Sequence, residues 1–146
     1  MRRLVLLVVA AFMLAACGSS HPQSSPTTSG KPSAESQIKS AYQKFFSGQA
    51  SVSQRAAVLQ NGAEFKPVIR AFASNPLAKN VHATVSSVTL RGPNNAKVVY
   101  TVKLGGAGLP QQTGTAVRQN GVWKVGDATL CKLVSLQGST PSVCKS

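Results

Sequence analysis

The segment from Thr113 to Cys131, TGTAVRQNGVWKVGDATLC, constrains the fold more than any other part of the chain. Asn120-Gly121 lies between two runs that favour strands, and this dipeptide supplies the two positive φ angles of a type I′ turn. Trp123 and Val125 alternate with a lysine, which predicts one buried and one solvated face. Asp127 is suited to cap a final helical segment, TLCKLVSLQ, that ends at a glycine. The segment therefore predicts a β-hairpin that leads into a helix.

Upstream of the hairpin, three segments carry apolar residues at helical spacing. The first begins at Ser33 and ends near Gly48, the second runs from about Ser53 to Gln60, and the third has Pro67 in its first turn and ends at Asn75-Pro76. The apolar residues of the first and third stripes are Ile38, Ala41, Tyr42, Phe45, Phe46, Phe65, Val68, Ile69 and Phe72. We expect these stripes to face the core.

Between the helical segments and the hairpin, the apolar period changes to two. Val81 to Leu90 and Ala96 to Leu104 read as strands, and the change of parity near Ser86-Ser87 predicts a bulge. Gly105 to Gly108 reads as a flexible turn. Helices followed by a meander of strands predict an α+β fold in which N-terminal helices pack on one face of a curved antiparallel sheet.

The N-terminus, residues 1–16, reads as an export signal. Two arginines precede an apolar run from Leu4 to Leu14, and this run is too short to span a membrane. The following Leu14-Ala15-Ala16-Cys17 is similar to a bacterial lipobox, after which Cys17 would become an acylated N-terminus. The alternative is an ordinary signal peptide with a cysteine there by chance. Acylation predicts a lipid-anchored protein on the extracytoplasmic side of the cell membrane.

Residues 17–32 are rich in Ser, Thr and Pro and have no apolar period, which predicts a disordered tether. A flexible chain of this length has an end-to-end distance of roughly 20 Å. The remaining residues, 33–146, are enough for one domain with one core.

The chain carries 16 Lys and Arg against 3 Asp and Glu, a formal net charge of +13. This field favours anionic partners such as lipid head groups or acidic wall polymers. The basic residues expected to be spread over the surface are Lys39, Lys44, Arg55, Lys66, Arg70, Lys97, Lys103, Arg118 and Lys124. Because no arginine-rich run or exposed aromatic stretch accompanies them, we expect no nucleic-acid partner.

The order of elements, together with GVWKVGDATLCKLVSLQG, FFSG and GAEFKPVI, resembles the mycobacterial low-molecular-weight-antigen lipoproteins. More distantly, it is similar to the cystatin-like cone of the nuclear-transport-factor-2-like superfamily. The resemblance implies a sheet curled around a mouth that serves as a ligand pocket, an enzyme site or an interaction surface. Tyr42, Tyr100 and Trp123 are then the candidate pocket residues, although Tyr42 and Tyr100 also suit a core.

The residue types needed for catalysis are scarce, and we expect no enzyme. Asp127 is better explained as a helix cap than as a general base, and His82 alternates out of phase with its apolar neighbours, so it should face solvent. Neither a metal site nor a cofactor site is predicted, because Cys131 and Cys144 have no nearby histidine or second pair. Once Cys17 is acylated, these two cysteines remain as an even pair and predict a disulfide, with free thiols as the alternative.

These observations predict an exported, lipid-anchored and non-catalytic binding module of the cell envelope that holds a small apolar ligand in the cone. The alternative is an accessory subunit that docks on a membrane complex or an anionic wall polymer. An isomerase or cyclase of the cone fold is a third reading.

Overall fold

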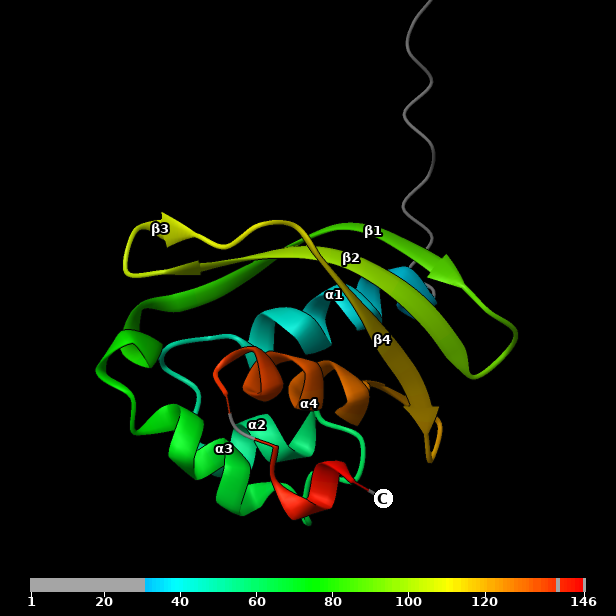
Figure 1. The fold of residues 1–146 in the computed structure, drawn as a ribbon. Coiled ribbons are helices and arrows are strands. Elements are labelled where there is room, and N and C mark those ends of the chain that lie inside the picture. The colour runs from blue at the N-terminus through cyan, green and yellow to red at the C-terminus, as the bar shows by residue number, and fades with distance from the viewer. Residues whose placement is uncertain (1–30, 139, 146) are drawn as a thin grey trace, which may run out of the picture. The chain divides into compact units, whose positions relative to one another are not determined.

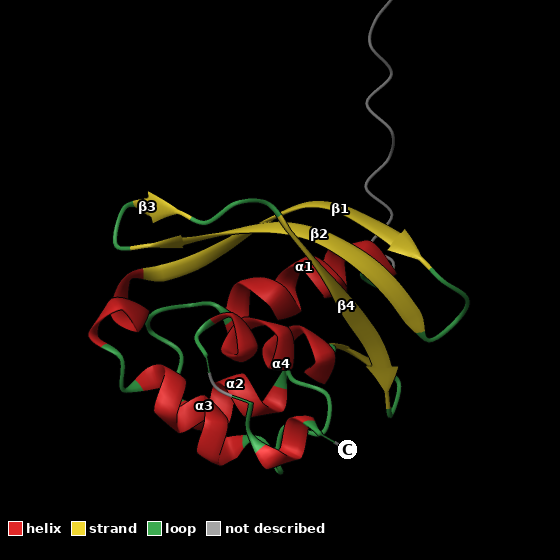
Figure 2. Ribbon diagram, viewed as in Figure 1, coloured by secondary structure: helices red, strands yellow, loops and turns green. Residues whose placement is uncertain are grey.

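The computed structural model describes residues 31–138 and 140–145. Helices and strands form two separate groups, with the strands in one antiparallel sheet (Figure 2). This arrangement confirms the predicted α+β class. The predicted signal peptide, most of the predicted tether and the acylation site at Cys17 lie outside the described residues.

Helix α1, Ala34–Phe45, begins where the sequence predicts. The hydroxyl of Ser33 accepts a hydrogen bond from the backbone N–H of Ser36, so one of the free donors of the first turn is satisfied. The predicted apolar stripe is buried: Ile38 and Tyr42 are fully enclosed. The stripe thus attaches α1 to the sheet.

Helix α2, Val52–Ala57, is shorter than predicted and starts one residue earlier. Ser51 and Gln54 form a reciprocal capping box that fixes its start. It ends before Gln60 because the next residues add to the sheet: Val125 N donates to Val58 O at 2.8 Å, and Gln60 N donates to Val125 O at 2.8 Å. This pairing covers an edge that would otherwise be open.

Helix α3, Lys66–Ala73, has Pro67 in its first turn, as expected. It is followed by a 3₁₀-helix, η1, Pro76–Asn80, which the sequence did not predict. Pro76 disfavours the α-helical conformation of the residue before it, so α3 does not continue. The chain then forms the more tightly wound 3₁₀-helix before the first strand.

The sheet contains β1, Val81–Leu90; β2, Asn95–Leu104; β3, Ala107–Gly108; β4, Gln112–Gln119; and β5, Val122–Val125. Strand order is β1-β2-β4-β5, and β3 pairs with β2. The register shift between Val85 and Ser87 is the predicted bulge. It keeps Val88 opposite Val98 and Leu90 opposite Ala96. Val88 packs against the core, whereas Leu90 is 53% exposed.

The glycine segment after β2 forms a hairpin where the sequence suggested only a flexible turn. Gly105 and Gly106 have φ angles of +56° and +97°, a conformation that glycine adopts without strain. Leu104 then pairs with Ala107, and Lys103 with Gly108. The β2–β3 hairpin therefore projects from the end of the main sheet.

The β4–β5 hairpin confirms the strongest prediction. Asn120 and Gly121 have φ angles of +52° and +78°, as a type I′ turn requires. Helix α4, Asp127–Leu136, follows, but its N-cap is Gly126, so the expectation that Asp127 caps the helix is wrong by one position. A glycine occupies the cap because a Cβ there would collide with Thr115.

The sheet arches over α1 and α4, while α2 and α3 lie farther from it (Figure 1). Core side chains come from the concave face of the sheet and from all four α-helices. A short 3₁₀-helix, η2, Ser142–Cys144, ends the described chain. Among the described residues, no helix combines the length and apolar character that a membrane crossing requires.

Candidate functional site

Two of the three candidate pocket residues lie together inside the curled sheet. Tyr42 is 0% exposed and Tyr100 is 1% exposed, and their rings meet edge to face with centroids 5.0 Å apart. The ring of Phe46 stacks on Tyr100 at 5.5 Å. These rings fill the interior of the cone with their own atoms, so Tyr42 and Tyr100 are core side chains in this conformation.

The hydroxyl of Tyr42 is satisfied within the protein. It donates to Thr115 O at 2.7 Å and lies 3.4 Å from the hydroxyl oxygen of Thr129, which accepts from Thr115 N at 2.8 Å. Gly114 permits this approach of β4 to α1 and α4, because a Cβ there would lie 2.6 Å from the Tyr42 hydroxyl. A buried hydroxyl with a protein partner has no need of a ligand.

Burial also changes the acidity of both tyrosines. Removal from water disfavours the charged phenolate, so the pKa of Tyr42 lies well above its ordinary value of 10.0. The same cause raises the pKa of Tyr100 to about 12. Both side chains are therefore neutral at physiological pH and cannot act as bases there.

Trp123 lies apart from the two tyrosines. It is 5% exposed, and its edge lines an open hollow of about 280 Å³ between the start of α1 and β5. Pro32, Ser36 and Val122 line the same hollow. The structure thus brings Tyr42 and Tyr100 together and places Trp123 in the wall of a separate, shallow surface feature.

Arg55 is a buried cation that the sequence analysis placed on the surface. It is 1% exposed, and its guanidinium donates to three backbone oxygens: Phe45 O at 2.6 Å, Ser47 O at 2.7 Å and Ala50 O at 3.1 Å. Its guanidinium carbon lies 5.3 Å from the centre of the Phe72 ring. Burial lowers its pKa, yet an arginine stays charged. Arg55 therefore joins the end of α1 to α2 and α3.

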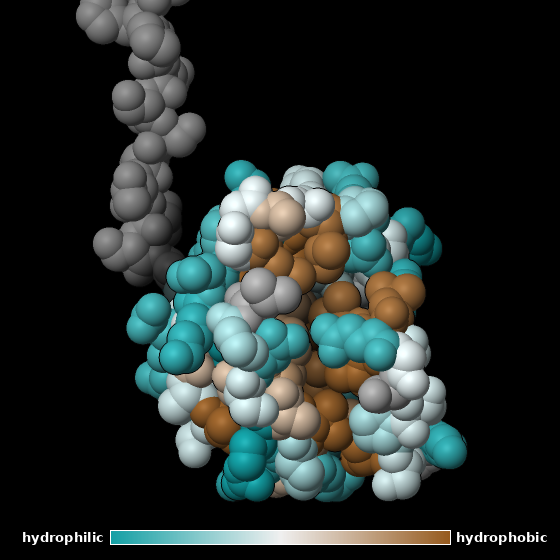
Figure 3. Space-filling view, turned by 60° about the vertical axis from the view of Figure 1, so that its left-hand side comes forward, coloured by the Kyte–Doolittle hydropathy of each residue, from teal (hydrophilic) through white to brown (hydrophobic). Residues whose placement is uncertain are grey.

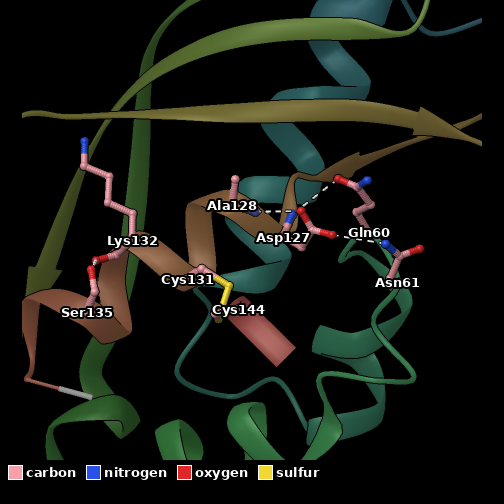
Figure 4. The surroundings of a disulfide bond; sticks show 8 residues. All are labelled: Gln60, Asn61, Asp127, Ala128, Cys131, Lys132, Ser135 and Cys144. Atoms are coloured by element: carbon pink, nitrogen blue, oxygen red, sulfur yellow. Dashed lines mark hydrogen bonds between the residues drawn. A yellow bond between two sulfur atoms is a disulfide. The ribbon is translucent and has the colours of Figure 1, made fainter. Parts of the chain in front are cut away.

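Asp127, the only aspartate of the chain, is held by its neighbours (Figure 4). One carboxylate oxygen accepts from Ala128 N at 2.7 Å, and the other accepts from the side-chain amide of Asn61 at 3.1 Å. Gln119 donates in turn to the Asn61 side-chain oxygen at 2.8 Å. This set of contacts connects α4 to the turn after α2 and to β4, which is a structural role.

The other candidate polar residues are dispersed. Glu35 pairs with Lys39 at 2.6 Å along α1, and His82 is exposed, as the strand parity predicts. Within the described part of the chain, no three His, Cys, Asp or Glu side chains gather as a metal site requires.

Cys131 and Cys144 form a disulfide, as their pairing in the sequence predicts (Figure 4). Their Cα atoms are 5.5 Å apart, within the usual range for such a bond. Both residues are half-buried and pack against the core. The bond holds the C-terminal segment, including η2, against α4.

An apolar groove lies where α3 faces the end of α4 and the C-terminal segment. It has a volume of about 360 Å³ and is lined on one side by Pro67, Val68, Ala71, Phe72 and Asn75 and on the other by Val134, Gln137 and Pro141. The sequence does not predict this groove, because its two walls are far apart in the chain. Val68 and Phe72, the half-buried members of the third apolar stripe, are the only signal of it in the sequence.

Comparison with known proteins connects this fold to one family. A family model described as the C-terminal domain of the low molecular weight antigen MTB12 matches residues 30–141, which is more than half of the 146 residues. A search of the curated proteins finds no match. The matched range contains α1 to α4 and β1 to β5 of the described residues, together with Cys131. The chain therefore belongs to the MTB12 C-terminal-domain family, as the resemblance of its sequence predicted.

Proposed function

We propose that the protein is an exported, lipid-anchored and non-catalytic module of the cell envelope that acts through its outer surface. The observation that carries the proposal is the filled cone: Tyr42 and Tyr100 occupy the interior where related folds would hold a ligand. Membership of an antigen family and the lipobox-like sequence before Cys17 support the envelope location.

The two other readings have less support. An apolar ligand inside the cone would have to displace aromatic rings that are packed against one another. An enzyme has no support from Asp127, because its hydrogen bonds to Asn61 and Ala128 serve to connect α4 to the neighbouring turn. A docking role, on a membrane or an anionic polymer, requires only the exposed cations and the surface hollows.

The experiment that tests the proposal removes the anchor. Cys17→Ala should abolish acylation and release the protein from the membrane fraction, because two acyl chains give stable anchoring. The measurement is fractionation of the native host, with mass spectrometry of the mature N-terminus. Ser19→Ala, two residues away, is the matched control and should remain in the membrane fraction with its acyl mass.

Wild-type protein without lipid mass, together with a Cys17→Ala variant that fractionates as wild type does, would contradict the anchoring that the proposal requires.

A further inference from the structure

The three acidic residues of the chain all lie toward the end that carries the β4–β5 hairpin. Glu64 lines a surface hollow together with Asn120 and Lys124, residues of that hairpin. Asp127 follows β5 directly. Glu35 is in the first turn of α1, which lies beside β5.

The opposite end of the folded unit gathers the β2–β3 hairpin, η1, the end of α3 and the end of α4, at the left in Figure 1. Gly105 N donates to Asn80 O at 3.2 Å, which joins the hairpin to η1. The exposed cations of these elements are Arg70, Lys79, Lys103 and Lys132. No acidic residue belongs to these described segments, so we call this region the acid-free end.

The acid-free end also carries exposed apolar surface. Leu136, at the end of α4, is 66% exposed, and Leu109, which follows the β2–β3 hairpin, is 36% exposed. The apolar groove between α3 and the end of α4 includes Gln137, the residue after Leu136, in its lining. Figure 3 brings this side of the molecule forward and shows several apolar patches with hydrophilic side chains between and around them. Exposed leucines and an apolar groove on one side of a domain are features of interaction sites.

We propose that the acid-free end docks on the anionic surface of a lipid bilayer. Apolar side chains that can enter the boundary of the acyl chains, on the same end as exposed cations that attract anionic head groups, are the two components of interfacial membrane binding. An acidic polymer would use the cations but would leave Leu136 and the groove in water. The inference extends the proposed envelope role by naming the surface and its partner.

The length of chain before the domain is compatible with this orientation. Pro32, next to the first described residue, lines the hollow between α1 and β5, at the opposite end of the domain. Fourteen residue steps separate Lys31 from Cys17. Fully extended, they reach about 45–50 Å, more than the roughly 35 Å diameter of a domain of this size. An anchor at Cys17 therefore permits either end to face the bilayer.

The test uses the chain from residue 17 onward with Cys17→Ser, so that no acyl group contributes. Its binding to phosphatidylcholine vesicles, with and without phosphatidylglycerol, is measured by flotation at physiological salt. We expect binding only to the anionic vesicles. The double variant Lys79→Gln/Lys103→Gln should weaken this binding about tenfold or more, since each cation near an anionic surface contributes roughly fivefold. The control is the double variant Lys66→Gln/Lys124→Gln, which removes the same number of positive charges near Glu64. It should weaken vesicle binding much less.

The apolar contribution has its own pair of variants. Leu136→Gln should weaken vesicle binding about fivefold, because a largely exposed leucine would lose its contact with the acyl region. Val122→Thr, at the opposite end, removes apolar surface from a residue that is 55% exposed and should change little. Equal losses from the two charge pairs, or unchanged binding of Leu136→Gln, would overturn the proposal. So would a dimer that Leu136→Gln dissociates in the absence of vesicles.

Vesicle binding in this test does not depend on acylation of Cys17, because the tested chain carries no lipid. Failure of vesicle binding would overturn this inference and leave the fractionation result intact.

Discussion

At the scale of single residues, Arg55 is the least expected feature of the structure. A buried charge is costly unless its hydrogen-bonding groups are satisfied, and here three backbone oxygens accept from the guanidinium. Two of these acceptors, Phe45 O and Ser47 O, lie at the end of α1, where the helix dipole favours a positive charge. The sequence presents Arg55 as one cation among many, so its burial could not be predicted from composition or spacing.

Replacement of this side chain should destabilise the fold. Arg55→Gln cannot reach all three backbone oxygens and would leave buried acceptors unpaired, at a cost of about 2–4 kcal/mol in the free energy of unfolding. Urea denaturation measures this difference. Arg70→Gln, at an exposed position of α3, is the matched control and should change stability by less than about 0.5 kcal/mol. Equal stability of the two variants would contradict the structural role assigned to Arg55.

At the scale of elements, the sequence predicted those parts whose signals are local. The turn at Asn120-Gly121, the stripe of α1 and the bulge in β1 each depend on neighbouring residues. The end of α2 was predicted too late, because Val58 and Gln60 leave the helix to pair with β5, a contact between distant segments. The groove between α3 and α4 was missed for the same reason: its walls meet only in the folded chain.

The disulfide joins α4 to the C-terminal segment that follows it in the chain. The double variant Cys131→Ser/Cys144→Ser should unfold at lower urea concentration, with a loss of about 3 kcal/mol from the greater freedom of the unfolded chain. Hydrogen exchange should show early opening of residues near η2 while the sheet stays protected. Unchanged stability, or alkylation of both thiols in the native unreduced protein, would contradict a formed disulfide.

At the scale of the whole molecule, the curled sheet forms a cone whose interior is packed rather than open. Tyr42, Tyr100 and Trp123 were candidate pocket residues because the cone fold that the sequence resembles can hold ligands. The apolar stripes that carry Tyr42 and Tyr100 favoured a core position, and the three-dimensional packing places both rings in the core. The segregation of charge is likewise a property of the folded chain: the three acidic residues are far apart in sequence but lie toward one end.

The central claim, that the cone is filled by its own aromatic side chains, can be tested by titrating its tyrosines. Tyr42 and Tyr100 are the only tyrosines of the chain, so the ultraviolet absorbance of tyrosinate reports on them alone. Burial raises both pKa values above the ordinary 10.0, so the stability contributed by the neutral phenols is present below pH 10 and is lost as the pH rises beyond it.

If the cone is filled, no tyrosinate absorbance should appear at pH 10 while circular dichroism shows an intact fold. Ionisation should occur only at higher pH and together with unfolding. Ionisation of either tyrosine with an apparent pKa near 10.0 in the folded protein would show that water reaches the interior, and would contradict a filled cone.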